Sequence, residues 1–150
     1  MASTVLTAAR RRFLGEARRA ILATLDGEGR PRLVPICFVV DPEHDTLYSP
    51  LDDKPKRTDD PRELARVRDI EARPEVSVLV DRWDEDWTGL AWLRLQGRAR
   101  LIDTGAAAPA GTIDRLRGRY PQYAHHRLED RPMIAIAVTR ASSWGDMDSP

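Results

Sequence analysis

The sequence predicts a mainly β protein, a six-stranded antiparallel β-barrel with peripheral helices. Three observations support this fold class. Short apolar runs of strand length alternate with turn residues, only three segments have helical spacing, and 150 residues are enough for one core. Helices so few and so irregularly placed do not suit a doubly wound parallel sheet. We therefore predict a single domain over 1–150, built around an antiparallel barrel.

The first half of the chain predicts an antiparallel meander of three strands. Ala20–Leu25 and Pro31–Val40 are apolar runs on either side of the turn Asp26–Gly29, which together are typical of a β-hairpin. A second turn at Asp41–Pro42 leads into a third strand, Thr46–Ser49.

Three segments are predicted to be helical. Within Thr4–Ala20, apolar residues recur about once per helical turn, with arginines on the other faces. Asp60 followed by Pro61 is typical of a helix start, and this second helix is expected to run to Ala72. The third predicted helix is Gly111–Arg119.

Three further strands are predicted in the second half of the chain. Val76–Val80 is nearly all apolar, as in a strand buried on both faces. Leu90–Ile102 alternates over a length that indicates a long strand, with Gly97 at an expected bulge or bend. Met133–Val138 is the final predicted strand, and an acidic, tryptophan-rich loop, Asp81–Trp87, separates the first two.

Composition excludes several function classes. Hydrophobic residues make up 41% of the chain, charged residues 32%, and the net charge is zero, so we expect no nucleic-acid binding. No apolar run reaches the roughly 20 residues of a membrane span, and Met1–Arg12 lacks the apolar stretch of a signal peptide. Cys37 is the only cysteine, which excludes an internal disulfide and a cysteine-cluster metal site. We therefore predict a cytoplasmic protein without membrane attachment.

A basic segment follows the third predicted strand. It runs Lys54-Pro-Lys-Arg-Thr58 and contains both lysines among the 24 basic residues of the chain. Arg62 and Arg66 stand one turn apart on the helix that follows. Several charge-assisted donors that converge on one point are what a phosphate requires. The alternative interpretation is a solvated charged face, because four aspartates are interleaved with the basic residues.

Five segments spread along the chain carry a resemblance to a known family. They are Ala23–Pro35, Asp53–Thr58, Arg66–Asp81, Asp84–Trp87 and Ser142–Trp144. They resemble the pyridoxamine 5′-phosphate oxidase-like superfamily and, within it, most closely the actinobacterial deazaflavin-dependent oxidoreductases. The resemblance covers the chain from Arg12 to Trp144. It implies a homodimer of split β-barrels, with a cofactor cleft shared between the two subunits.

The resemblance also implies where the cofactor binds. Its ring is expected beside two strand segments, Val34, Pro35, Ile36 and Cys37 on one strand and Tyr48, Ser49 and Pro50 on the next. Its phosphate is expected at Lys54, Lys56, Arg57 and Arg66. Among the four tryptophans, Trp87 is our candidate for the cleft, because large flat side chains stack on planar ligands, although they also suit a subunit interface.

The residues alone favour a structural role over a chemical one for Cys37 and for the acidic loop. The apolar neighbours of Cys37 favour core packing over a nucleophile. Asp84, Glu85 and Asp86 could form a metal or acid–base cluster, but consecutive loop residues point in different directions and no histidine lies nearby. We predict no metal site and no catalytic side chain.

The predicted function is hydride transfer from coenzyme F420 to a small conjugated or oxidised organic substrate, with the cofactor supplying the reactivity. An FMN-dependent oxidase or reductase of the same fold is the first alternative. A non-catalytic protein that binds a flavin, a deazaflavin or a tetrapyrrole is the second. True pyridoxamine phosphate oxidases carry further Arg and His residues near the C-terminus, where this chain offers Arg140 alone. Oxidation of vitamin B6 is therefore not predicted.

Overall fold

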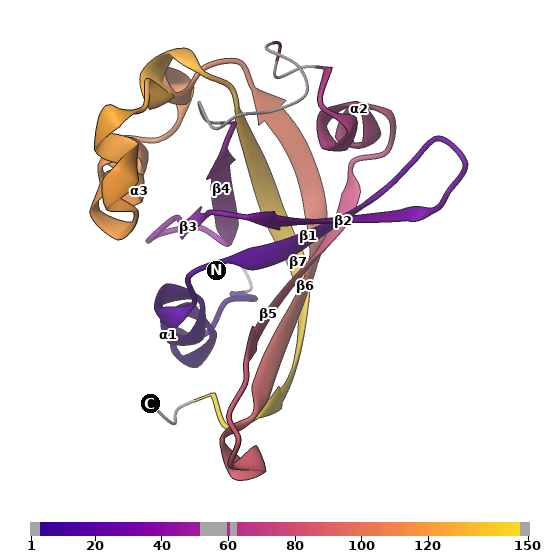
Figure 1. Ribbon diagram of the computed structural model, residues 1–150, viewed down its shortest axis with the longest axis vertical. Helices are drawn as coiled ribbons and strands as arrows, with labels where there is room; N and C mark the ends of the chain where they lie inside the picture. The colour runs from indigo at the N-terminus through magenta and orange to yellow at the C-terminus, as the bar shows by residue number, and fades with distance from the viewer. Residues whose placement is uncertain (1–3, 52–59, 61–62, 148–150) are drawn as a thin grey trace.

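The strands form one antiparallel sheet in the order β2-β1-β5-β6-β7-β4-β3 (Figure 1). The computed structural model describes residues 4–51, 60 and 63–147. The two edge strands, β2 and β3, are separated in sequence by Cys37 and Phe38 alone, so the sheet curls until its edges are adjacent. The mainly β, barrel-like architecture is confirmed. The strands are β1 (Ala20–Leu25), β2 (Pro31–Ile36), β3 (Val39–Val40), β4 (Thr46–Pro50), β5 (Glu75–Arg82), β6 (Ala91–Ile102) and β7 (Met133–Gly145).

The sheet has seven strands where the sequence predicts six, because the predicted strand Pro31–Val40 is divided. Its first part, β2, pairs with β1, whereas its second part, β3, pairs with β4. The chain changes partner at Cys37–Phe38, where the Phe38 side chain is fully buried. An apolar run with strand propensity does not reveal that its two halves pair with different neighbours.

Three helices pack around the sheet: α1 (Ala8–Glu16), α2 (Ala65–Ala72) and α3 (Thr112–Arg119). Figure 1 shows α2 at the upper right and both α1 and α3 at the left. Helix α1 is shorter than predicted because Thr7 is its N-cap and accepts a hydrogen bond from the Arg10 backbone N–H at 3.3 Å. Helix α2 also begins later than predicted, at Ala65.

The β6–β7 ladder is the longest pairing in the sheet. β7 continues to Gly145, well past the predicted end at Val138, and pairs with β6 along its whole length. The polar residues after Val138 conceal this extension in the sequence. The predicted bulge is confirmed, since the register shifts between Gln96 and Gly97. A Cβ atom on Gly97 would lie 2.3 Å from the Ala137 carbonyl oxygen, so glycine allows this close backbone approach.

Buried side chains lie on both sides of β4 and β7. Leu47 and Ile136 belong to the main core inside the curled sheet, whereas their neighbours Tyr48 and Ala135 pack in a second cluster with residues of α3. Successive side chains of a strand face opposite sides, which explains this division. The prediction that β5 is buried on both faces is wrong for a single chain, because Leu79 is 42% exposed. No helix in the described part of the chain is long and apolar enough to cross a membrane.

Candidate functional site

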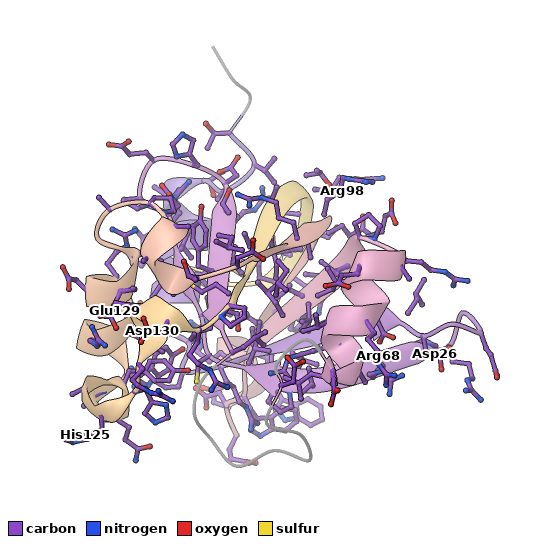
Figure 2. All side chains as sticks on the ribbon, turned by 90° about the horizontal axis from the view of Figure 1, so that it is seen from above. Asp26, Arg68, Arg98, His125, Glu129 and Asp130 are labelled. Carbon is purple, nitrogen blue, oxygen red and sulfur yellow. The ribbon has the colours of Figure 1, made fainter. Side chains whose placement is uncertain are left out.

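A groove of about 630 Å³ lies between β2 and the start of α2. Arg32 and Val34 line it from β2, while Arg66 and Arg68 line it from α2. Glu63 supplies a carboxylate to the described lining. The described lining holds three guanidinium groups against that one carboxylate, and Asp69 adds a second carboxylate behind Arg32, so the remaining basic excess suits a bound anion. Figure 2 shows Arg68 on the same side of the molecule as Asp26 of the β1–β2 turn, opposite His125.

A buried polar network supports the floor of this groove. Thr24 and Arg32 are directly opposite each other on β1 and β2, and Asp69 of α2 lies over both. Asp69 Oδ2 accepts hydrogen bonds from Thr24 Oγ1 at 2.7 Å and from Arg32 Nε at 2.8 Å. Thr24 and Asp69 are buried, whereas the Arg32 side chain is 43% exposed. The network therefore joins α2 to the β1–β2 hairpin and holds an arginine at the edge of the groove.

The turn between β1 and β2 is ordered by Asp26. Its Oδ1 accepts hydrogen bonds from the backbone N–H groups of Glu28 and Arg30, both at 2.9 Å. The Arg30 guanidinium donates to the other oxygen, Oδ2, at 2.9 Å. The backbone N–H of Arg30 is the largest cause of a pKa of Asp26 lowered from 3.8 to about 2. Burial opposes this shift, and the Arg30 guanidinium and the Glu28 N–H add to it. The hairpin that carries Arg32 thus has a fixed turn.

The predicted ring-contact residues on the strand β2 and just after it do not share one surface. Val34 is half-buried and lines the basic groove, while Pro35 is exposed on the opposite face of the strand. Ile36 is buried in the main core. Cys37 lines a different pocket, of about 230 Å³, with Tyr120 and other residues near α3. The structure thus brings Val34 together with Arg66, and places the other three elsewhere.

The predicted residues on β4 are buried. Tyr48 is 5% exposed and lines a groove of about 360 Å³ on the outer face of the sheet, together with Arg98 and Arg100. Burial and then the nearby Asp41 carboxylate raise the pKa of Tyr48, against the opposing effect of Arg100 and Arg115. Its phenol is therefore a neutral hydrogen-bonding group at physiological pH. Ser49 and Pro50 are also buried, and Ser49 faces the opposite side from Tyr48.

Trp87 lies away from the basic groove within one chain. It begins a short 3₁₀ helix (η2, Trp87–Gly89) in the β5–β6 connection, which Figure 1 shows at the end of the sheet opposite α2. Its side chain is 70% exposed. The neighbouring acidic residues bind the loop itself, since Asp84 accepts from the Asp86 N–H and Asp86 accepts from the Thr88 N–H and hydroxyl. These hydrogen bonds indicate that the two carboxylates stabilise the turn.

Three predicted phosphate-binding residues, Lys54, Lys56 and Arg57, lie outside the described residues.

Three residues that the sequence analysis did not single out, Arg32, Arg68 and Asp69, line or support the groove. Asp69 carries the clearest sequence signal, because it is a charged residue between Val67 and Ile70 on the apolar side of α2. A buried carboxylate needs a cationic or hydrogen-bonding partner, and its position indicates that one exists.

The curled antiparallel sheet, whose two edge strands follow each other in the chain, has peripheral helices and a basic groove beside one edge. These features define a protein of the split β-barrel class. The family model described as pyridoxamine 5′-phosphate oxidase matches residues 6–145, and the chain belongs to this family. No curated protein sequence matches it.

Several solved structures share the fold. A conserved hypothetical protein of Mycobacterium tuberculosis is 18% identical, with 99% of this chain and 89% of that chain covered and a TM-score of 0.70. HutZ, described as a heme storage protein of Vibrio cholerae, is 16% identical, with 95% of each chain covered and a TM-score of 0.66. A structure described as an F420 reductase is 20% identical, with 87% of this chain and 93% of that chain covered and a TM-score of 0.61. At these identities the likeness concerns the fold alone.

Proposed function

We propose that this protein binds coenzyme F420 in a cleft shared by two copies of the chain and transfers hydride to a small conjugated or oxidised organic substrate. The observation that carries the proposal is the groove between β2 and α2, in which Arg32, Arg66 and Arg68 gather on a fold shared with an F420 reductase. Its donor set suits a phosphate-bearing cofactor. The predicted contacts of Lys54, Lys56 and Arg57 with the same anion belong to this proposal.

The deazaflavin coenzyme is favoured over FMN by the extent of the basic surface. FMN has one phosphate on a short tail, whereas the deazaflavin carries a long acidic tail. The arginines on β2 and α2 together offer more hydrogen-bond donors than a single phosphate uses. An FMN-dependent oxidase or reductase on the same fold remains our second candidate.

The dimer is supported by an uncovered apolar sheet face. Leu33 and Leu79 are 67% and 42% exposed on β2 and β5, and Trp144 near the end of β7 is 53% exposed. Large apolar side chains gathered on one face typically mark an interaction surface. A second copy of the chain is the occupant we propose, because the cofactor cleft of such a dimer would gain its second wall from the partner. Trp87, at the far end of the same sheet, is the predicted contribution of the partner to the ring site.

In the proposed reaction the bound deazaflavin supplies the hydride. The protein contributes binding and orientation, which are the main requirements for such a transfer. The guanidinium groups of the groove hold the anionic tail, and Val34 offers an apolar surface beside it. The pKa of Tyr48 is raised above its usual value, so its neutral phenol suits a hydrogen bond that orients a substrate more than the donation of a proton.

The proposal is tested on protein freed of any ligand and titrated separately with coenzyme F420, FMN and heme. We expect the tightest binding for F420, and oxidation of reduced F420 when nitro or unsaturated acceptors are added. FMN binding with turnover would favour the second candidate. A Soret band without turnover would favour a tetrapyrrole-binding protein such as HutZ is described to be. Binding of none of the three would reject all these functions.

A further inference from the structure

Another groove, of about 360 Å³, lies on the outer face of the sheet and shares no described lining residue with the groove between β2 and α2. We propose that it binds the carboxylate of a small organic acid between the Tyr48 hydroxyl and the Arg100 guanidinium. This inference goes beyond the proposed function, because the groove needs no cofactor to bind the acid. Figure 2 shows Arg98, which also lines it, apart from Arg68 of the other groove. The described lining comprises Thr46, Tyr48, Pro74, Arg98, Ala99, Arg100, Ala135 and Ala137.

The register of three strands explains why a groove forms here. Tyr48 of β4 and Arg100 of β6 are both directly opposite Ala135 of β7, so the three residues form one row across the sheet. The next row on the same face is formed by Thr46, Ala137 and Arg98. Each alanine presents only a methyl group between two longer side chains, whose Cα atoms are about 10 Å apart across two strand spacings. The result is a trough with a methyl floor, hydroxyl groups along one wall and guanidinium groups along the other.

The Tyr48 hydroxyl is the group that most directly indicates a ligand. Its side chain is 5% exposed, yet the hydroxyl makes no hydrogen bond to any described residue. The described side-chain atoms that are fully enclosed without a partner are Arg66 Nε and Arg115 Nε, so the Tyr48 oxygen opens onto the groove that it lines. Burial raises the pKa of Tyr48, so the phenol stays protonated and can donate a hydrogen bond there. A nearly buried hydroxyl is costly unless an acceptor satisfies it.

The charges around the groove suit a monoanion. Arg100 makes no hydrogen bond or ion pair with the described residues, so its donors are available to a ligand. Arg98 donates from Nη1 to Glu75 Oε1 at 2.6 Å, which cancels much of its charge. Asp41 and Arg115 act on Tyr48 with opposite signs, and Asp41 Oδ1 already accepts hydrogen bonds from the backbone of its own turn. The remaining positive charge suits a carboxylate better than a doubly charged phosphate.

The rest of the lining suits the apolar body of such an acid. Ala135 and Ala137 present methyl groups, and Pro74, just after α2, adds an apolar ring. A few polar groups beside an apolar surface are typical of a site for a small molecule. A volume of about 360 Å³ lies at the small end of the range for ligand pockets, so the acid that fits is small.

The first experiment uses benzoate as the probe and benzamide as a neutral control of the same shape. Protein with isotope-labelled alanine methyl groups is titrated with each compound and followed by NMR. We expect benzoate to shift the Ala135 and Ala137 methyl resonances and to leave that of Ala124, an exposed residue near α3, unchanged. Benzamide should bind about tenfold more weakly, because it lacks the charge. Equal binding of the two compounds, or Ala135 and Ala137 resonances that do not move, would overturn the proposal.

Tyr48→Phe and Arg100→Gln remove the two proposed donors, and Arg94→Gln is the matched control. Arg94 is exposed on the same face of β6 and does not line the groove. We expect each of the first two changes to raise the dissociation constant of benzoate about tenfold, the effect of one hydrogen bond to a charged group, and Arg94→Gln to leave it unchanged. Tyr48→Phe should fold like wild type, because the lost hydroxyl has no described partner.

Two results of this comparison would contradict the proposal. Unchanged benzoate affinity in Tyr48→Phe would overturn the role of the hydroxyl. Equal effects of Arg100→Gln and Arg94→Gln would mean that only the general charge of the sheet face matters, and would overturn the role of Arg100.

Glu75→Gln should have the opposite effect on benzoate. Glu75 is directly opposite Arg98 on β5, and both side chains are mostly exposed, so the change removes a neutralising charge with little effect on packing. We expect benzoate to bind about threefold more tightly, in keeping with the modest strength of an exposed ion pair. Equal or weaker binding would overturn the electrostatic account of the groove.

The closing experiment separates this inference from the proposed function and a substrate from another ligand. Oxidation of reduced F420 by an unsaturated acceptor is measured at increasing benzoate in wild type and in Arg100→Gln. Competitive inhibition that Arg100→Gln relieves would identify organic acids as the substrate class, whereas benzoate binding without effect on turnover would identify a separate ligand site. Benzoate binding to a protein that binds no F420 would support the site and reject the proposed function. F420 turnover in a protein that binds no benzoate would support the proposed function and overturn the site.

Discussion

The two ends of the sheet differ in how far one chain completes them. Beside α2, Asp69, Thr24 and Arg32 satisfy one another and form a groove with a defined floor. At the other end, Trp83 and Trp87 are 66% and 70% exposed. Polar groups are thus paired within the chain, whereas large apolar groups are left uncovered. The comparison teaches that one chain satisfies the polar groups beside α2 and leaves large apolar side chains exposed at the other end, which is typical of an interaction surface.

The largest effect is expected when a charge is placed on the exposed sheet face that carries Leu33, Leu79 and Trp144. Leu79→Glu would place an unpaired carboxylate in the proposed interface, at a cost of ~3 kcal/mol, so the dimer dissociation constant should rise roughly 100-fold. Analytical ultracentrifugation measures this change, and F420 titration shows whether the monomer still binds cofactor. Ala124→Glu, on an exposed position near α3, is the matched control. An Leu79→Glu variant that assembles like wild type would remove the face from the interface.

Lys54→Ala combined with Lys56→Ala tests the phosphate contacts that the resemblance implies. We expect cofactor affinity to fall by ~2 kcal/mol, about 30-fold, if both side chains contact phosphate. Dimer formation should be unaffected, in contrast with Leu79→Glu. Isothermal titration with F420 measures the change, and unaltered affinity would reject both lysines as ligands.

Gly97 lies beside the register shift in β6, the long strand that runs between the two ends of the sheet. Gly97→Ala places a Cβ against the Ala137 carbonyl, and we expect a loss of about 1–3 kcal/mol in the free energy of unfolding. Gly118→Ala in α3 is the control, since a Cβ there meets no atom within 4 Å and should stabilise the helix by about 0.5–1 kcal/mol. Denaturant unfolding measures both. Equal stability of the two variants would mean that the bulge is easily displaced.

The smallest expected effect is the pH dependence of the β1–β2 turn. The pKa of Asp26 is lowered from 3.8 to about 2 in the folded protein, so its contribution to stability is complete above about pH 4. This contribution should be lost as the pH falls toward 2. Acid unfolding of wild type and Asp26→Asn measures it, and we expect their difference in stability to shrink over this interval. A constant difference would show that the carboxylate charge does not stabilise the turn.

Several elements were predictable because their signals are local. The hairpin Ala20–Ile36 follows from two apolar runs around a turn, and the bulge at Gly97 from one glycine within an alternating strand. The continuation of β7 to Gly145 was not predictable, because its polar residues are held in the sheet by pairing with β6. Strand formation there depends on a neighbour more than on propensity.

The candidate site also contains residues that could be predicted from the sequence and residues that could not. Helical spacing and the resemblance single out Arg66 as a predicted anion ligand, and the structure places it in a basic groove beside Val34. The position of Arg32 in this groove could not be predicted, because nothing near it in sequence distinguishes it from 21 other arginines. Its partner Asp69 is 37 residues away, and only the packing of α2 on the hairpin brings the two together.

The sequence by itself determined the class of fold, since alternating apolar residues and turns favour an antiparallel sheet whatever its partners are. It also determined the family, through segments spread along most of the chain. Only the tertiary structure decided which charges share a groove and which apolar side chains remain uncovered. Both depend on strand register and on contacts between distant residues, and a one-residue change of register would turn every side chain of a strand to the other face.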